Sequence, residues 1–183
     1  MATRVVPSAV DPATLAAPAA LAQQARAGST GALGDLYRLY GLALFRVAYR
    51  LTGSREDAED VLHDVFVGLP EALQRYEERG RLDAWIRRLT ARLSLMRVRS
   101  RRRRAVVALE DEHPSRETAT PGGDLEEAVR SLPEPLRNVL VLKEVEGYSH
   151  AEISEMLGIS VVTSRVRLMR ALRKLRRILG GMR

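Results

Sequence analysis

The chain has 183 residues, 45% of them hydrophobic, which is enough for one domain of ordinary size or two small ones. Its net charge of +7 favours a polyanionic partner, nucleic acid before an anionic membrane surface. The absence of cysteine excludes disulfides, thiolate metal sites and thiol redox switches, and no apolar run approaches the roughly 18 residues of a membrane span. Because the N-terminus lacks the basic start and apolar middle of a secretory signal, we expect a cytoplasmic protein.

Residues 18–104 are predicted to form a first helical domain, after a loose segment at 1–17. Apolar side chains repeat at three- and four-residue spacing along each helix, so the helices can bury one another's apolar sides. Ser54 is the predicted N-cap of the third helix, and Pro70 is expected to kink that helix. The predicted helices span 18–27, about 31–51, from Ser54 to a loop at 76–81, and about 82–100. The expected apolar stripe of the fourth is Leu82, Trp85, Ile86, Leu89, Leu93 and Met96.

Charge is concentrated in separate segments of this domain. Asp57, Asp60 and Asp64 fall on one side of the third helix, opposite its apolar side, where they form either a solvated surface or a contact for a basic partner. Residues 87–104 hold nine arginines and no acid. Such a run could be only a solvated helix end, but charges this dense repel one another and a phosphate backbone would relieve the repulsion. DNA contact is therefore predicted at the end of the fourth helix.

Residues 105–123 are predicted to be a flexible linker, because they combine prolines and glycines with a cluster of acids. Residues 124–183 follow as a second helical domain, and its last part has the pattern of a helix-turn-helix. Ser149 and Glu152 form a predicted capping box, and Gly158 supplies a bend after one short helix. The next helix carries seven basic residues and no acid. The second helix of such a motif enters a DNA major groove.

Three segments, Leu51–Phe66, Leu82–Leu89 and Leu132–Ser160, carry a resemblance to a known family. In this order and spacing they resemble the second region, the start of the promoter-melting helix and the fourth region of bacterial RNA polymerase sigma factors. The type is the extracytoplasmic-function (ECF) group of the sigma-70 family. The resemblance covers roughly residues 20–104 and 124–179. The expected fold is all-α, with two small helical domains joined by a flexible linker, the C-terminal one a helix-turn-helix.

The resemblance implies a protein that is not an enzyme and needs no cofactor. Such a factor binds core RNA polymerase through its first domain, on the coiled coil of the largest subunit. Its second domain reads the upstream promoter element as duplex DNA. Its first domain captures the non-template strand of the downstream element as that element opens.

On this resemblance, three sets of residues are expected to carry the function. Core polymerase would be bound by Asp57, Asp60, His63 and Asp64. The downstream element would be bound by Arg88, Arg92, Met96, Arg99, Arg101, Arg102, Arg103 and Arg104. The upstream element would be bound by Ser160, Thr163, Arg165, Val166, Arg167 and Arg170.

Four positions depart from the family pattern. His63 stands where Gln is usual, and both side chains can form hydrogen bonds. Arg92 replaces a common Asn and Met96 a common Asp, so the downstream base that is captured stays open. Ser164 replaces a buried Val in the recognition helix. Either that helix is rotated slightly or a small polar group lies in the core.

Other functions remain as alternatives at this point. A two-domain helix-turn-helix repressor or activator would use residues 20–104 as a sensor or dimerisation domain and bind duplex DNA without polymerase. A helical nuclease would need a carboxylate cluster facing DNA. The histidines show no metal-ligand spacing, and Trp85 is expected in the core rather than as a stacking platform for bases. We further expect an anti-sigma partner and a free chain that is monomeric.

Overall fold

The structure is a computed structural model that describes residues 17–77, 81–108 and 124–180. Over these ranges the chain forms helices and turns and no strand, which confirms the predicted all-α class. No helix within them is both long and apolar enough to cross a bilayer. The helices are α1 (Pro18–Arg26), α2 (Thr30–Thr52), α3 (Arg55–Gln74), α4 (Leu82–Ala108), α5 (Asp124–Arg130), α6 (Glu134–Leu140), the π-helical turn η2 (Val141–Val145), α7 (His150–Leu157) and α8 (Val161–Gly180).

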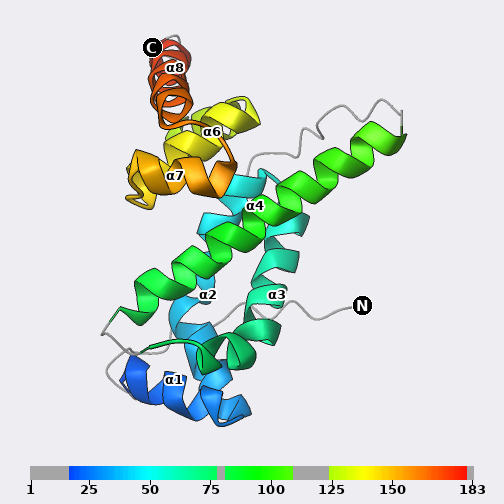
Figure 1. Ribbon diagram of the computed structural model, residues 1–183, viewed down its shortest axis with the longest axis vertical. Coiled ribbons are helices and arrows are strands. Elements are labelled where there is room, and N and C mark those ends of the chain that lie inside the picture. Colours follow the sequence, from blue (N-terminus) through cyan, green and yellow to red (C-terminus); the bar gives the residue numbers. More distant parts are fainter. Residues whose placement is uncertain (1–16, 78–80, 109–123, 181–183) are drawn as a thin grey trace.

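Helices α1 to α4 form the first domain around one apolar core (Figure 1). Gly53 ends α2 in the left-handed region, with φ of 73°, and the Ser54 hydroxyl accepts a hydrogen bond of 3.3 Å from the Asp57 backbone N–H to begin α3. Helix α3 continues through Pro70 to Gln74. The core includes Leu21, Leu36, Leu44, Val61, Val65, Leu69, Leu82 and Ile86. Trp85 packs against it as predicted, with its ring centroid 4.8 Å from that of Tyr76.

Helices α5 to α8 form the second domain, in which α8 packs on α5, α6 and α7. The predicted capping box is present at the start of α7: the Glu152 backbone N–H donates to the Ser149 hydroxyl, and the Ser149 backbone N–H donates to the Glu152 carboxylate at 2.9 Å. Gly158 ends α7 with φ of 64°. The helix-turn-helix predicted from the sequence is therefore present, with α8 as its second helix.

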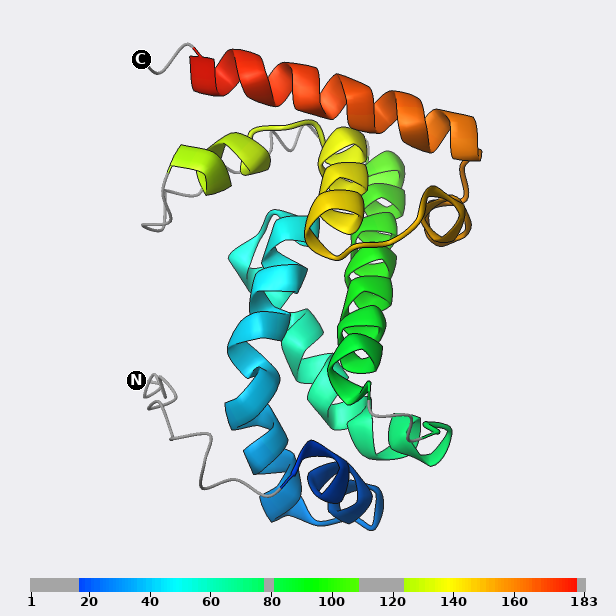
Figure 2. The ribbon, with the colours of Figure 1, turned by 90° about the vertical axis from the view of Figure 1, so that its left-hand side faces the viewer.

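The two domains pack directly against each other. Figure 2 shows α6 beside the ends of α2 and α4 that lie farthest from α1, with α8 running across that end of the molecule. One buried apolar cluster takes Val47 and Leu51 from α2 and Ala91 and Leu95 from α4. The second domain contributes Val139, Val141, Leu142, Tyr148 and Ile153 to the same cluster, which we call the interdomain core.

Helix α4 differs from its prediction in length and in its buried side. It continues to Ala108, four residues into the segment that was predicted to be linker, and the rest of that segment and residues 1–16 lie outside the described part of the chain. Met96 was expected on the apolar stripe but is 58% exposed, whereas Leu95 is buried against the second domain. Thr90 and Ser94 are fully buried, and each hydroxyl donates to the carbonyl one turn back. The buried side of α4 thus contains polar residues, which the spacing of apolar residues alone does not identify.

Candidate nucleic-acid interface

The predicted upstream-element residues lie at the start of α8. The Ser160 hydroxyl accepts a hydrogen bond of 3.0 Å from the Thr163 backbone N–H, which caps the helix. Arg165 and Arg170 are exposed, and Thr163, Val166 and Arg167 are half-buried. Two apolar side chains that the sequence reasoning missed, Val162 and Met169, are 68% and 55% exposed. They lie three and four residues from Arg165, so α8 presents an exposed side on which apolar and basic groups alternate.

Ser164 lies on the opposite, buried side of α8. It is fully buried, and its hydroxyl is 2.9 Å from Nδ1 of His150 at the start of α7. Burial lowers the pKa of His150, with smaller contributions from the positive charges of Lys143 and Arg165. Of the two possibilities that the sequence left, the small polar group in the core is the one observed. The hydrogen bond between two helices of the motif offsets the packing lost with the smaller side chain.

The predicted downstream-element residues on α4 separate into two groups. Arg92, Met96, Arg103 and Arg104 are exposed, and none of these three arginines forms an ion pair with another described residue. The remaining four are engaged within the chain. Arg88 pairs with Glu152 at 3.4 Å, Arg99 donates to the Met156 carbonyl, Arg101 pairs with Asp57 at 2.9 Å, and Arg102 pairs with Glu134 at 3.3 Å.

A surface pocket of about 160 Å³ lies between the two domains at this point. Arg88 and Arg92 of α4 line one side of it. Tyr148, Glu152, Glu155 and Met156 of the second domain line the other. The side of α4 on which base capture was predicted therefore faces the second domain.

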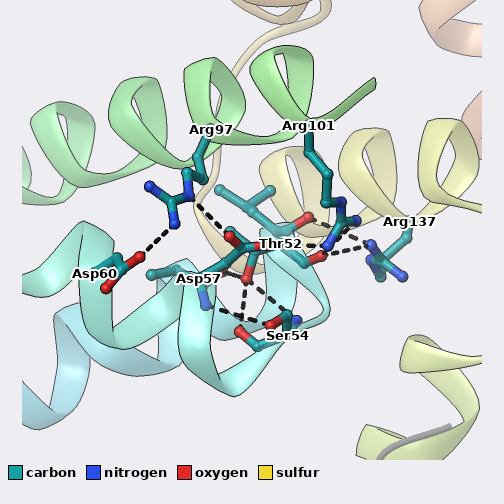
Figure 3. A network of polar contacts seen from close by, with 9 residues as sticks. Thr52, Ser54, Asp57, Asp60, Arg97, Arg101 and Arg137 are labelled. Atoms are coloured by element: carbon teal, nitrogen blue, oxygen red, sulfur yellow. Dashed lines mark hydrogen bonds and ion pairs between the residues drawn. The ribbon is translucent and has the colours of Figure 1, made fainter. Parts of the chain in front are cut away.

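Asp57 does not lie on an exposed acidic stripe, and that prediction is wrong. The residue is 8% exposed, and its two carboxylate oxygens accept hydrogen bonds from Arg97 at 2.8 Å and Arg101 at 2.9 Å. Figure 3 shows this network between the start of α3 and the later part of α4, with Arg97 also reaching Asp60. The hydrogen bond to Asp57 raises the pKa of Arg97 above its ordinary value. The network joins helices within the first domain.

The remaining acidic residues of α3 keep an exposed surface. His63 and Asp64 are exposed, and the Asp60 side chain is 47% exposed although it pairs with Arg97. Val67, three residues after Asp64, is 67% exposed. Of the four residues that were predicted to bind core polymerase, the structure thus brings three to one exposed side of α3.

Arg137 is a contact residue that the sequence reasoning missed. It lies on α6 and is 7% exposed, and its guanidinium donates to the carbonyls of Leu51 and Thr52 at 3.4 Å and of Arg130 at 3.2 Å. Burial lowers its pKa. The signal in the sequence was an arginine one residue after Leu136 and two before Val139, inside the apolar run of a helix.

Two family models match the chain. Sigma-70 region 2 matches residues 36–104, and sigma-70 region 4 matches residues 122–175.

Curated relatives are ECF RNA polymerase sigma factors. SigE of Mycolicibacterium smegmatis is 33% identical over 153 residues, which is 78% of this chain and 59% of the relative. SigM of Mycobacterium tuberculosis is 29% identical over 160 residues, which is 84% of this chain and 80% of the relative. SigW of Bacillus subtilis is 25% identical over 175 residues, which is 85% of this chain and 92% of the relative. This chain thus spans less than two thirds of the length of the first of these relatives.

Two solved structures share the fold. CnrH, solved in complex with the cytosolic domain of CnrY, has a TM-score of 0.53 and 28% identity and covers 88% of this chain and 96% of its own. The sigma factor RpoE of Bartonella quintana, solved in complex with the anti-sigma factor NepR, has a TM-score of 0.58 and covers 82% of this chain and 98% of its own. At 21% identity, the second likeness concerns the fold alone.

Proposed function

The chain belongs to the sigma-70 family, in its ECF group, and we propose that it binds core RNA polymerase and directs promoter-specific initiation of transcription. The observation that carries this proposal is the occurrence of both family regions, in order, in one chain, together with a helix-turn-helix in the second region whose second helix is basic. The chain acts as a binding factor, and the polymerase supplies the chemistry. We place it in the cytoplasm, where the polymerase and the DNA are.

Recognition of the upstream element belongs to α8. Exposed arginines near a helix N-terminus can reach base edges in the major groove, where Arg bridges O6 and N7 of guanine. Arg165 is the leading candidate because it is exposed in the first turns of α8. Ser160, Thr163, Val166, Arg167 and Arg170 complete the surface, and we add Val162 and Met169 as apolar contacts for thymine methyl groups.

Docking on core polymerase belongs to α3. Asp60, His63 and Asp64 lie on its exposed side, and an acidic surface suits a basic coiled coil of the polymerase. Exposed Val67 next to them supplies apolar area at the same surface. Asp57 acts indirectly, because it holds α3 against α4 through Arg97 and Arg101.

Capture of the downstream strand belongs to α4. Arg103 and Arg104 are exposed and suit phosphate contacts, which carry affinity but no base information. Arg92 and Met96 suit the border of a base pocket. Arg92 offers only hydrogen-bond donors, and Met96 offers an apolar surface. Arg88, Arg99, Arg101 and Arg102 join this surface only when their contacts within the chain are released.

An anti-sigma factor is a further proposed partner. Two proteins of the same fold were solved with such partners or their cytosolic domains. In this chain the second domain covers part of the DNA-binding surface of α4, which suits control by a protein that holds the two domains together. A repressor that acts without polymerase is the alternative, but it would leave the region 2 match without a role.

The proposal is tested by co-purification and DNA binding. The full chain should co-purify with core polymerase, and it should select promoter DNA only in that complex. Specific binding to duplex DNA by the chain alone, with no affinity for core, would favour the repressor instead. Asp64→Lys is the informative variant, because it should lose core affinity while keeping its helical content.

A further inference from the structure

The free chain holds its own DNA-binding residues in contacts between its two domains. We infer that this arrangement is a closed, autoinhibited state, in which the second domain covers the downstream-DNA surface of α4 and Arg137 fastens the two domains at the end of α2. The inference rests on the proposed function, because it concerns access to the DNA surface of a sigma factor.

The fastening point is the C-terminal end of α2. The last carbonyls of a helix have no partner within it, and they carry the negative end of its dipole. The Arg137 guanidinium reaches two of them, on Leu51 and Thr52, from the other domain at 3.4 Å. Arg101 donates to the Thr52 carbonyl as well, at 3.5 Å, so the two domains share this acceptor (Figure 3).

Gly53 makes the approach of Arg137 possible. Its φ of 73° suits glycine, and a Cβ at this position would lie 2.8 Å from Nη2 of Arg137. Such a distance is shorter than a van der Waals contact, so any other residue would push the guanidinium out of place. The glycine that ends α2 thereby also leaves room for a side chain of the second domain.

The contacts around this point cover the DNA surface. Glu152 and the Met156 carbonyl hold Arg88 and Arg99, and Glu134 holds Arg102. Arg103 and Arg104 follow Arg102 on α4 and form no ion pair with a described residue, whereas Arg92, which is also unpaired, lines the pocket between the two domains. A DNA strand and the second domain would therefore compete for the same guanidinium groups.

The closed state is suited to opening. No carboxylate of the described residues forms an ion pair with Arg137, so backbone carbonyls and the more distant charge of Glu134 offset its buried charge, and separation returns it to water. Two of the ion pairs between α4 and the second domain involve exposed arginines, because the Arg88 and Arg102 side chains are 62% and 58% exposed, and these two pairs contribute little each. The interdomain core supplies the main attraction.

Two variants should open the full chain without adding positive charge. Arg137→Ala removes the fastening group, and Arg38→Ala is its control, because Arg38 forms its ion pair within α2 at an exposed site. Ala91→Asp places a carboxylate in the interdomain core, and Leu42→Asp adds the same charge at a site on α2 that is 61% exposed. Helical content from circular dichroism checks the fold of each.

Opening is measured by small-angle X-ray scattering and by anisotropy of a short fluorescent single-stranded DNA of mixed sequence. Wild type and both controls should give the scattering curve of the closed arrangement, and both opening variants should have a larger radius of gyration. They should also bind the probe more tightly, although each variant has a net charge that is lower by one than that of the wild type. If about nine wild-type molecules in ten are closed, full opening strengthens apparent binding about tenfold.

Three results would overturn the inference. One is a wild-type chain that scatters as two separated domains. Another is a folded Ala91→Asp chain that stays compact and gains no affinity. The third is loss of helical content in both opening variants, which would mean that the two domains fold only as one unit. Failure of the proposed function is separate, because it appears as absence of core binding whatever the scattering curve shows.

Discussion

At the scale of single residues, packing gave different environments to side chains that the sequence could not tell apart. Asp57, Asp60 and Asp64 share one chemistry and a regular spacing, but Asp57 is 8% exposed between two arginines and Asp64 is exposed. The two partners of Asp57 come from α4, about forty residues away. Helical spacing on α3 alone carries no information about such partners, so the buried role of Asp57 could not be predicted from it.

We predict opposite effects for two of these carboxylates. Asp57→Ala should lower the free energy of unfolding by about 1–3 kcal/mol, because it leaves two charged hydrogen bonds unmade. Asp64→Ala should change it by less than about 0.5 kcal/mol, as expected for an exposed position. Urea denaturation of both variants measures this. Equal losses of stability would contradict the assignment of Asp57 to a structural network.

A pH dependence is expected at Glu146, whose side chain is 4% exposed and lies 3.7 Å from Arg87 of the first domain. Burial raises the pKa of Glu146, and the positive charges of Arg87 and Arg50 offset part of the shift. Since the folded pKa lies above the unfolded one, this residue contributes stability at acid pH that is lost as the pH rises through the folded pKa.

Glu146→Gln cannot ionise and should lack this dependence. The stability of the variant relative to wild type should be highest at neutral pH and should fall as the pH approaches the ordinary range of a glutamate. Urea denaturation at neutral and mildly acid pH gives the two differences. If the difference in stability between variant and wild type is the same at both pH values, burial does not raise the pKa of Glu146.

At the scale of helices, the sequence predicted that the helices exist and where most of them begin and end. Local capping groups act within a few residues, so Ser54, Ser149 and Gly158 were identified correctly without tertiary information. Helix α4 was predicted less well. Its buried Thr90 and Ser94 satisfy their hydroxyls within the helix, and Met96 turns outward, so its buried side does not follow hydrophobicity.

The two basic helices, α4 and α8, should differ in the part of the DNA that they contact. Arg165→Ala should weaken recognition of the upstream element in a sequence-dependent way, by about 1–3 kcal/mol, because a base-edge contact carries information. Replacing Arg103 and Arg104 together by Ala should weaken promoter binding almost equally for all sequences. It should also flatten the salt dependence, because phosphate contacts act through counterion release.

Binding of the polymerase complex to a small set of promoters at several salt concentrations tests both variants, with Arg38→Ala as a control for loss of one exposed charge. We limit the second variant to Arg103 and Arg104 because Arg101 and Arg102 also hold ion pairs within the chain. An equal loss on every promoter for Arg165→Ala would mean that Arg165 contacts phosphates.

At the scale of the whole molecule, the two helical units were predicted but their contact was not. Val47 and Leu51 of α2 follow the four-residue spacing of apolar side chains, and such spacing does not reveal which helix covers them. The one local signal was Arg137, a charge inside an apolar run. Its partners are backbone carbonyls, which no side-chain pattern in the sequence identifies.

The interdomain core leads to a prediction about the segment between the domains. A specific protease site introduced within residues 109–123 should be cut in the full chain, and the two fragments should still elute together on gel filtration, because the interdomain core holds them. Ala91→Asp should let the same fragments separate after cutting. Fragments of the wild-type sequence that separate at once would show that the interdomain core is too weak to hold the domains.

Run-off transcription on a promoter library with core polymerase is the direct test of promoter-specific initiation by this chain. We predict discrete transcripts from a subset of promoters when chain and core are both present, and none of those transcripts from either one alone. We also predict that Asp64→Lys abolishes them. No transcripts beyond those of core alone, from a folded chain that selects duplex DNA without polymerase, would contradict the claim.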